Sequence, residues 1–169
     1  MIVVVMGVSG SGKTVVGQAL ARSLGWPFLE GDDFHPTANV AKMAAGTPLT
    51  DDDRRPWLDR LAAEMATILR RGGHAVLACS ALKQSYRDRL ARAGRAPGDV
   101  RFVHLKSDYA TIAARLATRQ HRYMPASLLA SQFATLEEPA DAMVIDAGTA
   151  VDDEVARIRS GLDLGTAPA

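Results

Sequence analysis

The feature that most constrains the fold is a glycine-rich segment, Gly7–Thr14, that follows an apolar run and precedes a helical pattern. It reads G-V-S-G-S-G-K-T and fits the pattern G-x-x-x-x-G-K-[ST]. Glycines let such a loop turn tightly and point successive backbone N–H groups at phosphate oxygens, where the helix that follows adds the positive end of its dipole. The pattern brings the amine of Lys13 to the β- and γ-phosphates and the hydroxyl of Thr14 to Mg²⁺. The phosphate-binding residues that it predicts are Gly7, Val8, Ser9, Gly10, Ser11, Gly12, Lys13 and Thr14.

The rest of the chain alternates short β-branched runs with longer amphipathic stretches. This alternation is typical of βα units, and it predicts an α/β fold with a five-stranded, mostly parallel sheet and helices on both faces. The predicted strands are Ile2–Met6, Pro27–Glu30, His74–Cys79, Val100–Leu105 and Ala142–Asp146. The predicted helices are Lys13–Leu24, Pro36–Ala45, Asp51–Arg71, Lys83–Ala93, Tyr109–Arg119, Pro125–Ala134 and Val151–Leu162.

Length and composition favour one domain and disfavour several classes of protein. A chain of 169 residues fits one domain, which we expect over 1–163, with 164–169 as a flexible C-terminal tail. A net charge of +1 and 5% aromatic residues disfavour a nucleic-acid partner. No apolar run approaches the 18 residues of a membrane span, and the N-terminal run lacks the basic start of a signal peptide. The lone Cys79 favours neither a disulfide framework nor a zinc ribbon, so we expect a cytoplasmic protein.

The phosphate-binding loop leaves the reaction open. A guanine-nucleotide switch is disfavoured because neither D-x-x-G nor N-K-x-D occurs in the sequence. A motor or assembly ATPase normally has an acid after four apolar residues of a strand, and Asp146 comes close to that position. Asp146 lies at the end of the last predicted strand, however, and a turn residue is the favoured interpretation there.

Acidic residues gather after the second predicted strand, where ligands of open α/β sheets bind. Glu30, Asp32 and Asp33 can hold the water of a magnesium ion and accept a proton from a substrate, although a loop acid can also serve only as a turn-former or helix cap. His35 lies in the same acidic loop. Lys42 lies on the next predicted helix and can present a cation to the same cleft, or form part of a solvated face.

Basic residues form two further candidate anion sites. Arg54 lies in the first turn of a predicted helix, where the dipole disfavours a cation, so an anionic partner is expected. Lys83 and Arg87 lie one helical turn apart after the third predicted strand. Arg115 and Arg119 fit a mobile basic segment that closes over phosphates, excludes water and neutralises charge; solvated arginines are the alternative.

Taken together, these residues make the chain resemble the gluconate kinase (gluconokinase) family of P-loop small-molecule kinases over nearly its full length. The segments that carry the resemblance are G-V-S-G-S-G-K-T, G-D-D-F-H-P from Gly31, N-V-A-K-M from Asn39, G-T-P-L-T-D-D-D-R-R-P-W-L from Gly46, C-S-A-L-K from Cys79 and S-Q-F-A-T-L-E-E-P from Ser131. One segment departs from the family pattern, since Arg122 stands where the R-x-G-H-F of the family's lid has its histidine.

The resemblance implies a three-layer, adenylate-kinase-like fold with a helical lid at about 119–136. It also implies ATP as donor, Mg²⁺ as cofactor, D-gluconate as acceptor, 6-phospho-D-gluconate and ADP as products, and a homodimer. On this hypothesis Asp32 deprotonates the 6-hydroxyl and Glu30 holds metal-bound water. The residues expected to bind gluconate are Asp32, His35, Lys42, Arg54, Lys83 and Arg87. Lys13 and Arg119 would act on the transferring phosphoryl group, with Arg115 and Arg119 as phosphate clamps.

Two other functions remain open at this point. A kinase for another small hydroxy acid, such as shikimate, would carry a similar phosphate loop and lid. A nucleotide-binding regulatory module would hydrolyse ATP no faster in the presence of an acceptor. The acceptor therefore decides between the three hypotheses.

Overall fold

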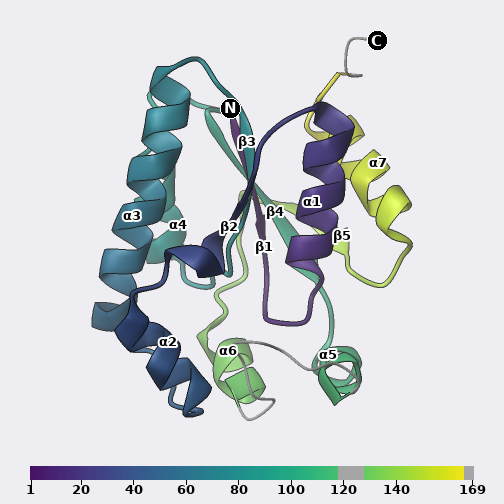
Figure 1. Ribbon diagram of the computed structural model, residues 1–169. Coiled ribbons are helices and arrows are strands. Elements are labelled where there is room, and N and C mark those ends of the chain that lie inside the picture. The colour runs from purple at the N-terminus through teal and green to yellow at the C-terminus, as the bar shows by residue number, and fades with distance from the viewer. Residues whose placement is uncertain (118–127, 166–169) are drawn as a thin grey trace.

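Five parallel strands form one sheet at the centre of the computed structural model, which describes residues 1–117 and 128–165. The strands are β1 (Ile2–Met6), β2 (Phe28–Glu30), β3 (Ala75–Ala78), β4 (Val100–Lys106) and β5 (Met143–Asp146). They lie in the order β2-β3-β1-β4-β5, and each neighbouring pair is parallel (Figure 1). Because β1 lies between β3 and β4, the strand order reverses at its carboxyl end, which is where open α/β sheets form a ligand crevice. The predicted α/β class is confirmed.

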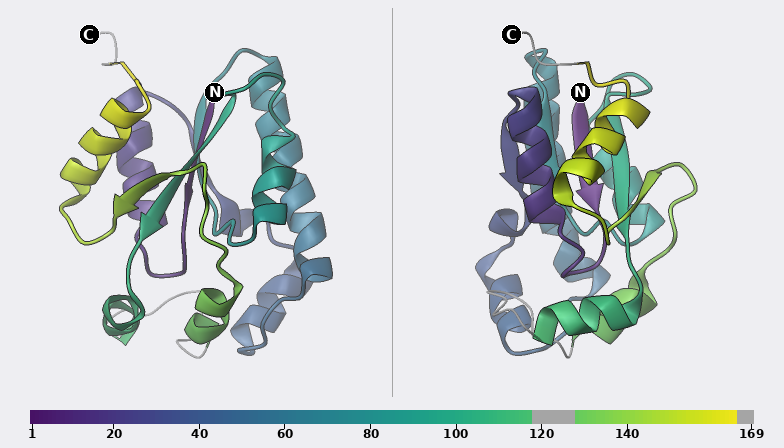
Figure 2. Two further views of the ribbon diagram at one scale, coloured as in Figure 1. Left: turned by 180° about the vertical axis from the view of Figure 1, so that it is seen from behind. Right: turned by 90° about the vertical axis from the view of Figure 1, so that its right-hand side faces the viewer.

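Helices cover both faces of the sheet and its carboxyl end. They are α1 (Lys13–Leu24), α2 (Thr37–Ala44), α3 (Asp51–Arg70), α4 (Gln84–Ala91), α5 (Tyr109–Ala117), α6 (Leu129–Thr135) and α7 (Val151–Gly161). Helices α3 and α4 cover one face, and α1 and α7 cover the other (Figure 1). Figure 2 shows α5 and α6 beyond the end of the sheet that lies opposite the chain's N-terminus. The described elements thus form three layers. The short helices α5 and α6 lie at the carboxyl end of the sheet, where the glycine-rich loop follows β1.

Each face of the sheet packs its own apolar cluster. Alternate residues of β1 point to opposite faces, so Val4 belongs to the same cluster as Leu61 of α3, whereas Val5 belongs to the cluster that contains Leu20 of α1. A third cluster, which includes Val8 and Ile112, joins the loop after β1 to α5 and α6. This third cluster fixes the helices at the carboxyl end against the glycine-rich loop.

The boundaries of α1 agree with the prediction because glycines mark both ends. Gly12 precedes the helix at a φ of 99°, and Gly25 ends it at a φ of 67° with its N–H donating to the carbonyl of Arg22. The other predicted helices that lie within the described residues differ from the observed ones by a few residues at their ends. The last two residues of the helix predicted over Tyr109–Arg119, the first residues of the helix predicted over Pro125–Ala134 and residues 166–169 of the predicted tail lie outside the described ranges.

A short 3₁₀ helix, η1 (Gly31–Phe34), follows β2 and was not predicted. It begins at Gly31, where a Cβ would overlap the carbonyl oxygen of Ala78 at the end of β3. Only glycine lets the backbone pass this close to the neighbouring strand. The four-residue turn brings two acids, Asp32 and Asp33, directly to the carboxyl edge of the sheet.

The C-terminal end of the described chain is packed further than expected. Leu164 was placed in a flexible tail, but its side chain is 8% exposed and joins the cluster between α1, α7 and the sheet. The backbone N–H of Leu164 donates to Arg159, and the Arg159 guanidinium donates to the carbonyl of Gly165. Of the helices in the described ranges, none is both long and apolar enough to cross a bilayer.

Candidate active site

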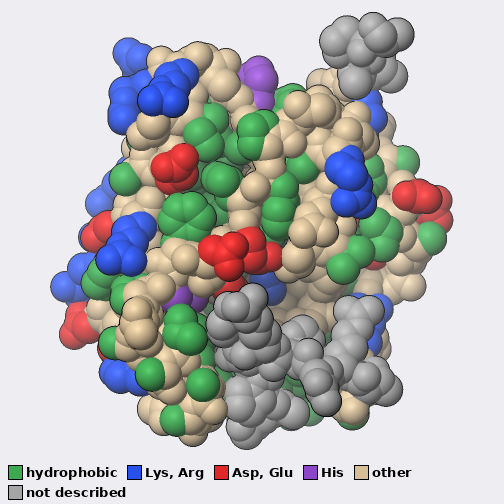
Figure 3. Space-filling view, in the orientation of Figure 1, with side chains coloured by type: hydrophobic (Ala, Val, Ile, Leu, Met, Phe, Trp, Pro, Cys, Tyr) green, Lys and Arg blue, Asp and Glu red, His purple; other side chains and the backbone are tan. Residues whose placement is uncertain are grey.

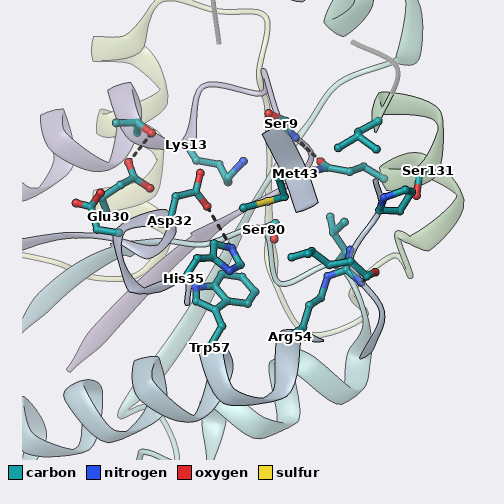
Figure 4. Close-up of a pocket in the computed structure, with 17 residues that line it drawn as sticks. Ser9, Lys13, Glu30, Asp32, His35, Met43, Arg54, Trp57, Ser80 and Ser131 are labelled. Atoms are coloured by element: carbon teal, nitrogen blue, oxygen red, sulfur yellow. Dashed lines mark hydrogen bonds and ion pairs between the residues drawn. The ribbon is translucent and has the colours of Figure 1, made fainter. Parts of the chain in front are cut away.

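A cavity of about 300 Å³ opens at the carboxyl ends of β1, β2 and β3. Figure 3 shows the molecule in the orientation of Figure 1, with exposed acidic side chains near the centre of the visible face. The cavity is lined by Ser9, Lys13, Thr14, Glu30, Asp32, Asp33, His35, Met43, Pro48, Leu49, Arg54, Trp57, Ser80, Leu82, Leu128, Ser131 and Gln132. The strand ends, α2, α3 and α6 therefore all contribute residues to this one cavity. Figure 4 labels Lys13, Asp32 and Arg54 among the residues that line it.

The glycine-rich loop forms one wall of the cavity. Gly10 has a φ of 84°, and a Cβ there would come 3.1 Å from Ile112 and 3.2 Å from Leu116 of α5. The loop therefore needs glycine both for its backbone conformation and for its close packing on α5. The Lys13 amine donates to the carbonyl oxygen of Val8 at 3.0 Å, which folds the side chain back over the loop. Burial lowers the pKa of Lys13, and the nearby charge of Asp32 opposes that shift.

Thr14 and Glu30 join the start of α1 to the end of β2. The Thr14 hydroxyl donates to Glu30 Oε2 at 2.7 Å. Burial raises the pKa of Glu30, and the hydrogen bond from Thr14 lowers it by a smaller amount. No group of three or more His, Cys, Asp and Glu side chains suited to a metal ion occurs in the part of the chain that the structure describes. The hydroxyl and carboxylate oxygens do suit Mg²⁺, which is commonly bound by one or two protein oxygens together with phosphates and water.

Asp32 is held in place by contacts between η1 and α3. Trp57 Nε1 of α3 donates to the carbonyl of Gly31 at 2.7 Å, and the Trp57 ring stacks on His35 with centroids 4.1 Å apart. His35 Nε2 lies 4.0 Å from Asp32 Oδ1 (Figure 4). Burial lowers the pKa of His35 to about 4, so the imidazole is neutral at pH 7. The Asp32 carboxylate is half exposed and faces the cavity beside a neutral ring.

Arg54 supplies a cation from the first turn of α3. Its Nη1 donates to the carbonyl of Leu49 at 2.6 Å and to the Tyr86 hydroxyl at 3.4 Å. The guanidinium also lies 5.7 Å from the centre of the Tyr86 ring. Tyr86 in turn donates to Asp51. These contacts fix Arg54 at the cavity wall.

Four of the predicted basic site residues within the described ranges, Lys42, Lys83, Arg87 and Arg115, do not line the cavity. Lys42 pairs with Asp53 at 2.7 Å, and Lys83 pairs with Asp51 at 2.7 Å. Arg115 donates to the carbonyl of Ala147 at 2.5 Å. Arg87 donates to two carbonyls of the loop before α4. Arg119 lies outside the described residues.

Arg87 is buried beneath the loop that leads into α4. The residue is 1% exposed, and its Nη1 donates to the carbonyls of Ala81 and Leu82 at 3.1 and 3.0 Å. Its Nε and Nη2 donate to Gln84 Oε1. Because the Arg87 guanidinium donates hydrogen bonds to Ala81, Leu82 and Gln84, we interpret Arg87 as a structural residue that stabilises this loop.

Some cavity residues received no role from the sequence. Gln132 of α6 accepts a hydrogen bond from the backbone N–H of Ser9 at 2.6 Å, and Ser131 lies beside it. The segment S-Q-F-A-T-L-E-E-P already pointed to this region, but only as part of a resemblance. Trp57 of α3, which belongs to the segment from Gly46 that carries the resemblance, also lines the cavity.

Asp146 does not line this cavity. It ends β5, two strands away from β1, and borders a separate hollow with Lys106, Asp108 and Thr111. The residues that follow β3, the strand beside β1, are Cys79 and Ser80. The position of Asp146 agrees with a strand-end residue rather than with the acid of a motor ATPase.

Comparisons with known proteins show the family of the chain. A family model described as an AAA domain matches residues 2–140. A gluconokinase from Gluconobacter oxydans is 53% identical, over 82% of this chain and 76% of that protein. A crystal structure of a gluconokinase from Sinorhizobium meliloti aligns at a TM-score of 0.84 with 43% identity, covering 95% of this chain and 90% of that one. A sugar kinase from Janibacter aligns at 0.89 with 42% identity, covering 97% and 95%. The chain therefore belongs to the AAA domain family that this model describes and, within it, to the gluconokinase family.

Proposed function

We propose that this protein transfers the γ-phosphoryl group of ATP to the 6-hydroxyl of D-gluconate, giving 6-phospho-D-gluconate and ADP. The observation that carries the proposal is one cavity lined by a phosphate-loop lysine, Lys13, a carboxylate, Asp32, and a fixed cation, Arg54. Gluconate carries both a carboxylate and hydroxyl groups, and this cavity offers partners for both. The names of its relatives, gluconokinases among them, support the same acceptor.

On the donor side, the proposed phosphate site is the loop Gly7–Thr14 at the N-terminus of α1. Its backbone N–H groups and Lys13 bind the β- and γ-phosphates. Thr14 would hold Mg²⁺ directly and Glu30 would hold it through water; the ion, when bound, neutralises charge on the phosphates. Arg115 and Arg119 remain proposed phosphate clamps, of which Arg115 requires a change of partner from Ala147.

On the acceptor side, Asp32 is the proposed general base. Its carboxylate faces the cavity, and its position is fixed by the bond between Trp57 and Gly31. A carboxylate there orients the 6-hydroxyl and takes its proton as the oxygen attacks the γ-phosphorus in line. Neutral His35 would offer one donor or acceptor to a substrate hydroxyl without adding charge.

Arg54 is the proposed partner of the gluconate carboxylate. Among the predicted substrate cations it is the one that lines the cavity, whereas Lys42, Lys83 and Arg87 are engaged elsewhere. A planar guanidinium suits a carboxylate because it can form two parallel hydrogen bonds. Lys42 and Lys83 would join the site only by leaving their aspartate partners, and Arg87 has the least access.

Three wider features belong to the same proposal: a homodimer, a cytoplasmic location and a lid over about 119–136. Sedimentation of the purified protein tests the dimer, and cell fractionation tests the location. Limited proteolysis with and without an ATP analogue tests the lid, since closure should protect a cleavage site within 119–136. One domain over 1–163 remains part of this proposal.

The acceptor is tested by comparing sugar acids and shikimate in a coupled assay of ADP release. The proposal predicts that gluconate gives the highest kcat/KM and that ATP hydrolysis without acceptor is slow. Equal turnover of gluconate and the other acids would remove the acceptor assignment. Hydrolysis that no acceptor stimulates would favour a regulatory module instead.

A further inference from the structure

Helix α6 lines the cavity but has no part in the proposed reaction. It contributes Ser131 and Gln132 to the wall, and Leu128, just before it, also lines the space. Gln132 Oε1 accepts a hydrogen bond of 2.6 Å from the backbone N–H of Ser9 (Figure 4). Ser9 belongs to the phosphate-binding loop, so a side chain of the acceptor wall is bonded to the donor site.

The segment after α6 is anchored to the rest of the protein independently of Gln132. The backbone N–H of Glu137 donates to the carbonyl of Leu82 at 2.9 Å, and Glu137 Oε2 accepts from the N–H of Gln84 at 2.7 Å. Glu138 pairs with Lys106 at 3.1 Å. These contacts anchor the segment that directly follows α6, so the Gln132 side chain can change its partner while residues 137 and 138 stay in place.

A phosphate oxygen would compete with Gln132 for the N–H of Ser9. The N–H groups of such a loop bind phosphate, and a hydrogen bond to a charged acceptor is roughly twice as strong as a bond to a neutral amide. ATP that fills the loop would therefore displace the Gln132 oxygen. The Gln132 side chain already lines the space shared with Asp32 and Arg54, so the released amide oxygen can accept a hydrogen bond from a hydroxyl of a polyhydroxy acid there.

We propose that Gln132 exchanges the Ser9 amide for a hydroxyl of the acceptor when ATP binds, so that bound nucleotide tightens acceptor binding. This inference rests on the proposed function and deepens it. Gln132 is a specificity-determining residue of the acceptor site, and its bond to Ser9 occupies the amide oxygen when nucleotide is absent. By linkage, the acceptor tightens nucleotide binding by the same factor.

The test measures gluconate binding by calorimetry with and without a nonhydrolysable ATP analogue and Mg²⁺. In the unaltered protein the analogue should tighten gluconate about five-fold, the effect of one ordinary hydrogen bond. Gln132→Met keeps an unbranched side chain but cannot accept a hydrogen bond from Ser9. In this variant the ratio of gluconate affinities with and without the analogue should fall to about one, because the coupling depends on that hydrogen bond. The analogue alone should bind this variant as tightly as, or more tightly than, the unaltered protein.

Gln18→Met is the matched control. Gln18 is exposed on α1, outside the cavity wall, and its replacement should leave the coupling ratio unchanged. A second variant, Gln132→Glu, keeps an acceptor for Ser9 but adds negative charge beside the phosphates, so it should weaken binding of the analogue. Glu also forms helix well, which keeps this test open if Gln132→Met fails to fold.

The outcomes separate the two proposals. Coupling that persists in folded Gln132→Met overturns the role of Gln132 and leaves the kinase assignment intact. Tight analogue binding by Gln132→Glu likewise overturns it. If the unaltered protein binds the analogue but not gluconate under either condition, the acceptor assignment fails, and the inference fails with it.

Discussion

At the scale of single residues, basic and acidic side chains occupy different parts of the cavity wall, although the net charge of the chain is only +1. Lys13 serves the phosphate loop and Arg54 serves the acceptor wall, while Glu30, Asp32 and Asp33 lie on the side of β2 and η1. A neutral His35 between Asp32 and Trp57 adds no further charge. The wall therefore presents cations to two anionic reactants and a carboxylate to the hydroxyl that reacts.

Replacement of Asp32 by Asn tests the proposed base. The amide keeps the shape of the side chain but cannot take the proton, so kcat should fall by roughly 10²- to 10⁴-fold. Binding of an ATP analogue should change little, as calorimetry would show. Asp52→Asn, on the exposed start of α3, is the control and should retain activity. A near-normal kcat in Asp32→Asn would remove Asp32 from this role.

His35 predicts a loss of stability in mild acid. Its pKa is about 4 in the folded protein against an ordinary value of 6.5, so between these values the unfolded chain binds more protons. Stability is therefore complete above pH 6.5 and falls as the pH drops toward 4, by about 3 kcal/mol in total. Urea unfolding of His35→Gln from pH 7.5 to 4 should show a shallower decline. An equal decline in both proteins would contradict the buried neutral imidazole.

Two of the predicted catalytic residues, Lys13 and Asp32, line the cavity, whereas of the predicted substrate cations only Arg54 does so among the described residues. Lys13 begins the helix after the glycine-rich loop of β1, and Asp32 lies two residues after the end of β2, so the position of each relative to the sheet is set by a short, local pattern. Lys83 and Arg87 have the predicted helical spacing, but the carbonyls that bind Arg87 belong to an irregular loop in which Ala81 has a φ of 44°. Hydrophobic periodicity does not predict such a loop. It also does not predict ion pairs between distant segments, such as that of Lys83 with Asp51.

At the scale of elements, local end signals explain which boundaries could be predicted. Thr50 and Asp53 form a capping box that begins α3 at the predicted residue. Helix η1 was missed because four residues are too few for a periodic pattern, and its path depends on contact with β3. The role of α6 as a cavity wall depends on tertiary contacts that no pattern within the segment contains.

The hydrogen bond from Trp57 of α3 to Gly31 of η1 predicts the effect of Trp57→Phe. Phenylalanine cannot donate to the buried carbonyl of Gly31, and the lost bond should cost about 1–3 kcal/mol in urea unfolding. Because η1 also carries Asp32, kcat should fall as well. Trp26→Phe is the matched control, since Trp26 stacks on His74 away from the cavity. Unchanged stability and kcat in Trp57→Phe would show that η1 does not depend on this bond.

At the scale of the whole molecule, the sheet and its two faces supply stability, whereas the carboxyl edge supplies the site. Leu77 of β3 is fully buried in the cluster shared with α3 and α4. Leu77→Ala should cost about 2–5 kcal/mol in urea unfolding, because it leaves a cavity in a packed core. At low temperature, where the variant stays folded, KM for gluconate should not change.

Val144→Ala is the control for that prediction. Val144 is 51% exposed on β5, so its truncation should cost less than about 1 kcal/mol. A large rise in KM for Leu77→Ala, without loss of stability, would contradict the separation of core and site. An equal loss of stability in both variants would contradict the burial of Leu77.

The central claim is tested most directly by identifying the product that the purified protein forms from ATP, Mg²⁺ and D-gluconate. Phosphorus NMR should show one phosphomonoester at the 6-position of gluconate, formed in equal amount with ADP. Inorganic phosphate as the product, released at a rate that gluconate does not change, would contradict the account.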